Sequence, residues 1–190
     1  SFVKNQESEK YVGMSIQELG EATRKDPLDA IFDLIRDEEN IVGLVDFYGT
    51  EGHVKEFLQR PEQNVCTDGI IGSKPHPRLY GAFTRVLGKY VRDEGVLCFE
   101  EAIHKMTGKP AEVLGLKKRG LLKEGYAADV LVIDPELVRD KGEYTDPNHL
   151  SEGIDYSIVN GVVIINDGKA VEERAGQVLR YRGREENTAQ

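Results

Sequence analysis

The chain has few cysteines, no excess of positive charge and no long apolar segment, and each shortage argues against a class of protein. Its 190 residues carry a formal net charge of −9, whereas a nucleic-acid-binding domain would show a basic face. No apolar run approaches the roughly 20 residues that a transmembrane helix needs. The two cysteines, Cys66 and Cys98, form no CxxC pair. We therefore expect buried thiols in a reducing cytoplasm and no disulfide scaffold.

The N-terminus also lacks two features. Residues 1–6 contain neither the apolar core of a signal peptide nor an initiator methionine. We therefore expect a chain that was processed or cut from something longer. Its length suffices for one domain or two small ones.

Residues 15–67 alternate between helical and strand patterns. Ser15 and Glu18 form a capping-box pattern for a helix over 15–25. Asp26-Pro27 starts a second helix, and Thr50 caps a third. Apolar runs predict a mostly buried strand over 41–48 and a short one over 64–67. This spacing favours parallel strands with crossover helices, and two such strands are too few for a stable parallel sheet. The segment therefore resembles the last part of a larger α/β domain.

Two further helices are predicted over 79–92 and 99–107, followed by one turn over 111–114. The first should bury an apolar stripe made of Phe83, Val86, Leu87 and Tyr90. In the second, His104 should face solvent.

Beyond Leu116 the pattern changes to strands. We expect a strand over 127–134, a hairpin over 156–168 with its tight turn at Asn160-Gly161, and a short strand over 177–181. The expected organisation is an α/β portion over 1–115, a β-rich portion over 116–182 and a disordered tail over 183–190.

Asp68 is the candidate catalytic residue. It follows the short apolar run that ends at Thr67 and precedes Gly69. A carboxylate at the exposed end of a buried barrel strand is costly to desolvate and is usually functional. The alternative is a simple turn, in which the aspartate bonds to nearby backbone and the glycine takes a positive φ.

His76 and Arg78 are candidate substrate-binding residues. They lie in a loop that Pro75 and Pro77 stiffen. Arg78 could bind a substrate carboxylate through two parallel hydrogen bonds. The alternative is that Arg78 pairs with an acidic neighbour and that His76 only packs.

The order of these motifs resembles the C-terminal part of the N-acyl-D-amino-acid deacylases (D-aminoacylases) of the amidohydrolase superfamily. The resemblance runs from Ser15 to Arg180. It is carried by residues 67–69, 76–83, 85–92, 100–108, 119–120, 125–130, 134–135, 159–161 and 166–168.

This resemblance implies an α/β fold: the last strands and helices of a (β/α)8 barrel, with part of a small β-sandwich. It also implies that Asp68 acts as general base on a metal-bound water during hydrolysis of an N-acyl-D-amino acid. The family's zinc ligands are a His-x-His pair, a cysteine or modified lysine, and histidines after the fifth and sixth strands.

The chain departs from the family pattern at the metal. Its four histidines, His53, His76, His104 and His149, show no metal-ligand spacing, and a catalytic zinc needs three protein ligands. We therefore expect no zinc on this chain alone and no activity without the missing N-terminal part of the barrel.

Two alternatives stay open at this point. The chain could belong to a hydrolase of cyclic amides, such as a hydantoinase or dihydropyrimidinase, or it could be a non-catalytic subunit that completes another polypeptide. Unpaired strand edges also predict a homo-oligomer that covers residues 41–48. Neither nucleic acid nor membrane is expected as a partner.

Overall fold

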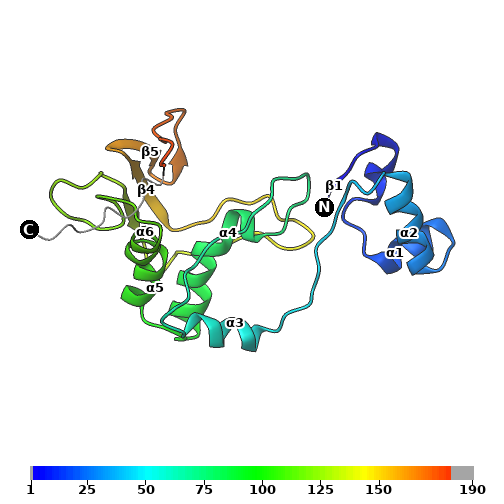
Figure 1. Ribbon diagram of the computed structural model, residues 1–190, viewed down its shortest axis with the longest axis horizontal. Coiled ribbons are helices and arrows are strands. Elements are labelled where there is room, and N and C mark those ends of the chain that lie inside the picture. The colour runs from blue at the N-terminus through cyan, green and yellow to red at the C-terminus, as the bar shows by residue number, and fades with distance from the viewer. Residues whose placement is uncertain (1, 181–190) are drawn as a thin grey trace, which may run out of the picture. The chain divides into compact units, whose positions relative to one another are not determined.

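The computed structural model describes residues 2–180 (Figure 1). The chain divides into two compact units, which are described separately. Unit 1 comprises residues 2–48, 67–80 and 141–150, and unit 2 comprises residues 49–66, 81–140 and 151–180. The expected boundary between residues 115 and 116 stays a prediction.

Unit 1 begins with a small helical assembly. Its elements are β1 (Phe2–Val3), the 3-10 helix η1 (Gln6–Tyr11), α1 (Ile16–Thr23), α2 (Pro27–Asp37) and β2 (Val42–Gly43). The predicted capping box is confirmed, because Ser15 accepts the Glu18 amide and Glu18 accepts the Ser15 amide at 2.7 Å. Asp26 accepts the Leu28 amide at 2.9 Å and so caps α2. The helices pack against each other.

Glu38 holds the start of the chain onto the end of α2. Its side chain is fully buried. One carboxylate oxygen accepts the backbone N–H groups of Lys4 and Asn5, both at 2.7 Å, and the other accepts the Asn5 side chain at 3.0 Å. Hydrogen bonds from the side chain of Ser8 and from Asn5 and Lys4 hold the pKa of Glu38 below its ordinary value. A buried carboxylate is tolerated here because its acceptors are satisfied.

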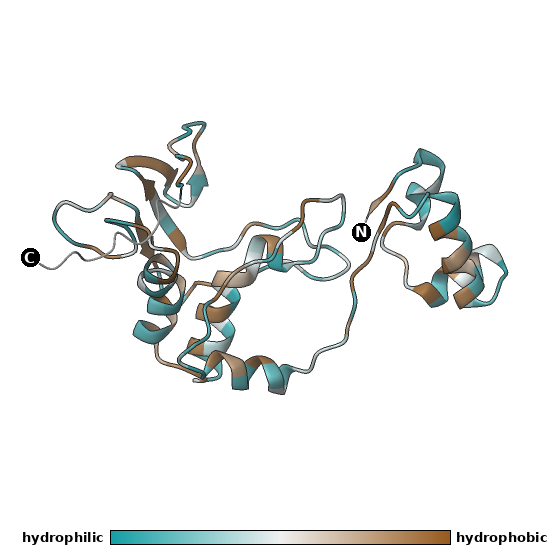
Figure 2. Ribbon diagram, viewed as in Figure 1, coloured by the Kyte–Doolittle hydropathy of each residue, from teal (hydrophilic) through white to brown (hydrophobic). Residues whose placement is uncertain are grey.

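The two predicted parallel strands are wrong. Residues 41–48 contain only β2, which pairs antiparallel with β1, and residues 64–67 contain no strand. The apolar run is exposed instead: Leu44 is 70% exposed, Phe47 71% and Tyr48 89%. It forms the brown part of the segment between β2 and α3 in Figure 2. The physical reason is that a parallel strand needs hydrogen-bonding neighbours, and the described residues supply none.

Helices form the core of unit 2. Its helical elements are α3 (Glu51–Leu58), the last residues of α4 (Arg78–Arg85), the π-helix η2 (Val86–Asp93), α5 (Phe99–Met106) and α6 (Gly108–Val113). Thr50 caps α3 as predicted. The buried apolar cluster consists of Leu58, Val65, Val86, Leu87, Tyr90, Leu97, Ala102 and Val138.

Most of the predicted apolar stripe is confirmed, and one residue is wrong. Val86, Leu87 and Tyr90 are buried, whereas Phe83 is 40% exposed. Phe83 lies in α4, before the chain passes into the wider π-helical winding of η2. The prediction assumed α-helical spacing from Phe83 to Tyr90, and because the winding changes at Val86 it placed Phe83 wrongly on the buried face. His104 is exposed, as expected.

A loop over 134–140 packs closely against η2. Arg92 donates to the Val138 carbonyl at 2.6 Å, and Val138 is 1% exposed. A methyl group at Gly88 would lie 2.6 Å from the same carbonyl oxygen. Glycine is therefore required where the helix and this loop meet.

The rest of unit 2 is an antiparallel sheet in the order β3 (Val130–Ile133), β4 (Ile154–Val159), β5 (Val162–Asn166) and β6 (Lys169–Ala170). The predicted hairpin is confirmed, with φ of 49° at Asn160 and 82° at Gly161. Arg119 contacts both Asp129 and Asn160 and so fastens the turn. Residues 177–180 form no strand, against expectation. Residue 181 and the tail lie outside the described residues.

Glu38 makes the start of the chain sensitive to acid. Because its folded pKa is lowered, the stabilisation is present above its ordinary pKa of 4.5 and is lost as the pH falls through the folded value. We expect the Lys4 and Asn5 amide protons to exchange faster in acid, after correction for intrinsic exchange, and in Glu38→Gln at neutral pH. Amide hydrogen exchange measures both. Glu39→Gln is the matched control, because the exposed Glu39 side chain pairs with the Lys4 side chain and not with the Lys4 or Asn5 amide; equal effects of the two variants would contradict the assignment.

Gly88 and Gly52 should respond to alanine in opposite directions. Gly88→Ala forces a methyl group against the Val138 backbone and should lower the free energy of unfolding by about 1–3 kcal/mol. Gly52 lies in α3 with only Thr50 Oγ1 near, at 3.8 Å. Gly52→Ala should therefore raise that free energy by about 0.5–1 kcal/mol through helix propensity. Urea denaturation checks both, and a neutral Gly88→Ala would rule out the tight contact.

Candidate active site

Asp68 lies in an exposed loop of unit 1. Its φ of 43° is left-handed, a conformation that aspartate adopts more readily than most residues. The Gly69 amide donates to Thr67 Oγ1 at 3.3 Å. The Asp68 side chain is 78% exposed, so a ligand could reach the carboxylate.

Gly69 brings this loop directly against the first turn of α4. A Cβ at this position would lie 2.7 Å from Leu79 Cδ1 and 2.9 Å from Leu79 Cα. The second atom is backbone and cannot rotate away. The turn that the sequence offered as the alternative is not formed: Asp68 and Gly69 lie in an irregular loop, and the φ of Gly69 is not positive. The glycine is needed for close approach instead.

Arg78 binds Asp68 through two atoms. Its Nε donates to the Asp68 carbonyl oxygen at 2.9 Å, and its Nη2 donates to the Asp68 carboxylate at 2.9 Å. Its side chain is 40% exposed. This is the acidic-neighbour alternative that the sequence left open. A substrate-binding role for Arg78 stays a prediction.

His76 contacts the same helix end. Its Nδ1 accepts the Arg78 amide at 3.0 Å, so the neutral ring carries its proton on Nε2. The ring packs edge-on against Tyr144 at a centroid distance of 5.1 Å, and Tyr144 packs against Phe47 at 4.6 Å. The structure thus brings all three predicted site residues together. It also places Tyr144 beside them. In the sequence, Tyr144 stands out only as an aromatic residue within a polar stretch.

These residues do not fit a zinc site by themselves. Within residues 2–180, no three histidine, cysteine, aspartate or glutamate side chains are close enough to hold a metal ion. His149 pairs with Asp146 at 2.7 Å. The expectation of buried thiols is wrong, because Cys66 and Cys98 are both exposed: residues 64–67 form no strand, and Cys98 lies at the exposed N-cap of α5.

A second cluster of ionisable groups surrounds Tyr90 in unit 2. Burial, together with a hydrogen bond to Glu51 and the negative charge of Glu51, raises the pKa of Tyr90 to about 12. The Lys89 ammonium lowers the pKa of Glu51. Arg85 pairs with Asp140 at 2.9 Å. Perturbed pKa values can mark functional sites, but these groups neutralise one another around a core tyrosine, which fits a structural network.

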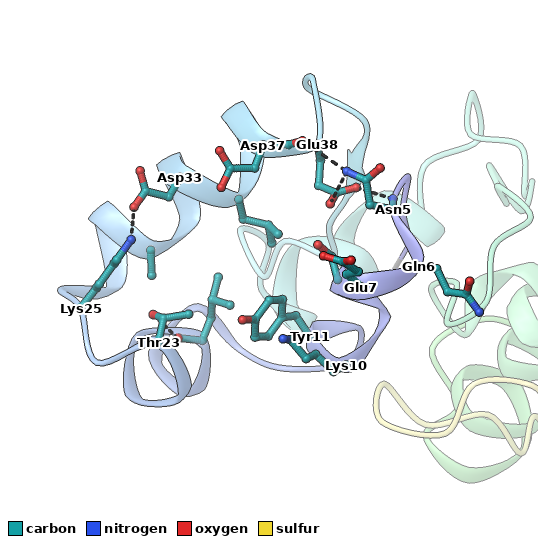
Figure 3. A pocket seen from close by; sticks show the side chains of 14 residues that line it. Asn5, Gln6, Glu7, Lys10, Tyr11, Thr23, Lys25, Asp33, Asp37 and Glu38 are labelled. Carbon is teal, nitrogen blue, oxygen red and sulfur yellow. Dashed lines mark hydrogen bonds and ion pairs between the residues drawn. The ribbon is translucent and has the colours of Figure 1, made fainter.

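A polar hollow of about 720 Å³ lies between η1, α1 and α2 (Figure 3). Several of its polar side chains bind each other: the Lys25 ammonium donates to Asp33 at 2.5 Å, and the Asn5 side-chain amide donates to Glu38 at 3.0 Å. An active site would instead direct such groups toward a shared vacant point. Asp68 with its neighbours therefore remains the stronger candidate.

Comparison with known proteins decides the family. Residues 54–165 match the "Amidohydrolase family". The chain belongs to this family. It is 37% identical over 166 residues to the N-acyl-D-aspartate deacylase of Alcaligenes xylosoxydans xylosoxydans, an alignment that covers 84% of this chain and 33% of the relative.

Solved structures of amidohydrolases agree with this assignment. The crystal structure of N-acyl-D-glutamate deacylase from Bordetella bronchiseptica, complexed with zinc and a phosphonate mimic of the tetrahedral intermediate, matches with a TM-score of 0.77 and 37% identity. That match covers 87% of this chain and 34% of that one. A crystal structure of D-aminoacylase matches with a TM-score of 0.80 and 34% identity over 89% of this chain and 35% of its own.

A less similar relative is an enzyme of another name, and the chain is shorter than all the relatives described. Dihydroorotase from Lactobacillus delbrueckii is 31% identical over 140 residues, which is 70% of this chain and 31% of that protein. The chain spans about a third of the length of the deacylases it matches. Among the residues that the structure describes, none of the helices combines the length and apolarity needed to cross a bilayer.

Proposed function

We propose that this amidohydrolase chain is the C-terminal portion of an enzyme that hydrolyses the amide bond of N-acyl-D-amino acids. Three kinds of support agree: identity to the deacylases over most of the chain, the structural match to one that holds a tetrahedral-intermediate mimic, and an accessible aspartate beside a close-packed glycine. The exposed Asp68 carboxylate carries the proposal, because amide hydrolysis needs a proton acceptor for the attacking water.

In this proposal the Asp68 carboxylate first accepts a proton and later returns it. Its carboxylate accepts a proton from the water as the water oxygen bonds to the amide carbon. The tetrahedral intermediate then collapses, the C–N bond breaks, and the Asp68 carboxyl returns the proton to the leaving amine. The products are a carboxylic acid and a free D-amino acid, so the carboxylate ends in its starting state.

The ligands for the family's zinc would have to come from elsewhere in the enzyme, because residues 2–180 hold no group of three histidine, cysteine, aspartate or glutamate side chains that could bind a metal ion. His76, Arg78 and Tyr144 lie beside Asp68 and could contact the substrate, which would carry a carboxylate of its own. The organisation stays as proposed from sequence: a barrel portion over 1–115 and a sandwich portion over 116–182.

The partner of this chain would be the rest of the barrel. Several large apolar side chains of unit 1, some before and some after Asp68 in the sequence, are exposed. They are Leu44, Phe47, Tyr48, Ile70 and Ile71. Exposed apolar surface of this kind marks an interaction face, and the chain is about a third of the length of its relatives. We propose that the missing portion covers these side chains and that, without it, copies of the chain cover one another.

A cyclic-amide hydrolase is the second candidate, because dihydroorotase also matches the chain. The attack of water on an amide carbon would need the same proton acceptor. The higher identity to the deacylases favours the linear N-acyl-D-amino acid as substrate.

Replacing the Asp68 carboxylate tests the proposed function. In the full-length enzyme that contains this segment, Asp68→Asn should lower kcat for an N-acetyl-D-amino acid by about 10²–10⁴-fold, because an amide cannot accept the proton. Asp167→Asn is the matched control, since Asp167 is also exposed, has a φ of 49° and precedes a glycine. Retained turnover in Asp68→Asn refutes the role.

The present chain alone should bind no stoichiometric zinc and show no turnover. Mass spectrometry checks the zinc content, and the same assay checks the turnover.

Association of the isolated chain tests the partner proposal. We expect a dimer or larger assembly that dissociates on dilution, because Leu44, Phe47 and Tyr48 expose apolar surface. Leu44→Ser with Phe47→Ser should shift the light-scattering mass toward the monomer. Phe57→Ser is the control, because Phe57 is 65% exposed on α3 of unit 2. A wild-type chain that is monomeric at every concentration would contradict the proposal.

A further inference from the structure

We infer that Tyr144 is a positioning residue, which holds the His76 ring against the first turn of α4 so that Arg78 can bind the carboxylate of the substrate. This inference rests on the proposed function. It comes from the contacts between the loop over 141–150 and the segment that precedes α4, all of which lie within unit 1.

The first observation is that the loop over 141–150 is closed on itself. Glu143 and Asp146 exchange two backbone hydrogen bonds, at 3.0 Å and 3.2 Å, so that Tyr144 lies in the tight turn between them. The Asp146 carboxylate contacts the His149 ring at 2.7 Å. Pro147 is fully buried and anchors the loop. Tyr144 is therefore presented from a turn whose backbone is fixed.

The second observation is that this loop packs on the segment that precedes α4. A Cβ at Gly142 would lie 2.8 Å from the Pro147 carbonyl oxygen and 3.4 Å from Pro77 Cβ. The lack of a side chain at Gly142 therefore lets the loop lie against Pro77. The Asn148 side-chain amide donates to the Ser73 carbonyl oxygen at 2.9 Å. These two contacts keep the loop in place beside His76 independently of Tyr144.

The third observation is that the Tyr144 ring fixes the rotation of the His76 ring. The two rings meet edge-on, with an interplanar angle of 88° and centroids 5.1 Å apart, and Phe47 supports Tyr144 from a centroid distance of 4.6 Å. His76 Nδ1 accepts the Arg78 amide at 3.0 Å. This amide belongs to the first turn of α4, whose N–H groups have no partner within the helix. Because the acceptor is a ring atom, rotation of the His76 ring would break the bond.

The fourth observation is that Arg78 keeps donors for a second carboxylate. A guanidinium has five N–H donors, and two bonds of 2.9 Å join it to the Asp68 carbonyl and carboxylate. Its side chain is 40% exposed. The remaining donors can bind a substrate carboxylate through two parallel hydrogen bonds, which depend on the angle of the guanidinium plane. A shift at the start of α4 should therefore weaken substrate binding, while the contact of Gly69 with Leu79 still holds Asp68 in place.

The test compares Tyr144→Ala and Tyr144→Phe in the full-length enzyme that contains this segment. In Tyr144→Ala we expect KM for an N-acetyl-D-amino acid to rise about tenfold, with kcat within about threefold of the wild type, because binding is weakened and the proton acceptor stays in place. Tyr144→Phe should resemble the wild type, since the ring remains. Tyr126→Ala is the control and should change neither constant, because the Tyr126 ring contacts the Lys123 ammonium at 5.7 Å in unit 2.

A double-variant cycle separates support of Arg78 from direct contact with the substrate. Arg78→Ala should itself raise KM by about 10–10²-fold, because a charge-assisted pair is lost. Adding Tyr144→Ala to Arg78→Ala should raise KM no further, because Tyr144 acts through Arg78. Additive effects would overturn the inference, since Tyr144 would then contact the substrate itself. A Tyr144→Phe variant as impaired as Tyr144→Ala would also overturn it, because the hydroxyl would be the group that matters.

The proposed function and the positioning role fail in different ways. Retained turnover in Asp68→Asn removes the proposed proton acceptor, whatever Tyr144 does. Normal kinetics in Tyr144→Ala beside an inactive Asp68→Asn leave the proton acceptor standing and remove only the positioning role.

Amide hydrogen exchange tests the link without measuring activity. In Tyr144→Ala of the full-length enzyme, a peptide over residues 75–80 should exchange faster, because the bond from the Arg78 amide to His76 is lost. A peptide over η2 should stay protected, and Tyr144→Phe should protect both peptides. Unchanged exchange over residues 75–80 would overturn the inference. Faster exchange of both peptides would overturn it too, because a loss of positioning leaves η2 intact.

Discussion

The contact between Gly69 and the first turn of α4 is the constraint on which the site depends. With no side chain at Gly69, the loop backbone lies against Leu79. Arg78, one residue earlier in the same turn, can then donate to the Asp68 carbonyl oxygen and to the Asp68 carboxylate. A larger residue at position 69 would push the aspartate away from its partner. The geometry of the proposed base is therefore set by packing between backbone segments, and charge attraction acts within that geometry.

A second close contact of this kind lies within unit 2. After α4 the chain continues as η2, whose buried Val86, Leu87 and Tyr90 pack with Val138. Gly88 again allows a close approach, here to the Val138 carbonyl. The ionisable groups around Tyr90 are paired, so they stabilise the helix without forming a second reactive centre. In each unit, a glycine thus permits a close approach between a helix and a loop.

The exposed apolar side chains of unit 1 are the surface that the proposed missing portion would cover. Residues 41–48 have the apolar composition of a buried strand, yet most of them form no strand and several are open to solvent. The chain spans about a third of the length of its deacylase relatives, and the strands that the structure describes all pair antiparallel.

Local chemistry was readable from the sequence. The capping box at Ser15, the Pro27 helix start and the Asn160-Gly161 hairpin each depend on residues close together in the chain, and all three are confirmed. The family resemblance is also confirmed, by the match over residues 54–165. The sequence also picked out Asp68, His76 and Arg78. Only the tertiary structure decided that Arg78 binds Asp68, that Tyr144 packs on His76, and that Phe83 and both cysteines are exposed. These outcomes depend on contacts between distant segments and on absent strand neighbours, which periodicity within one segment cannot report.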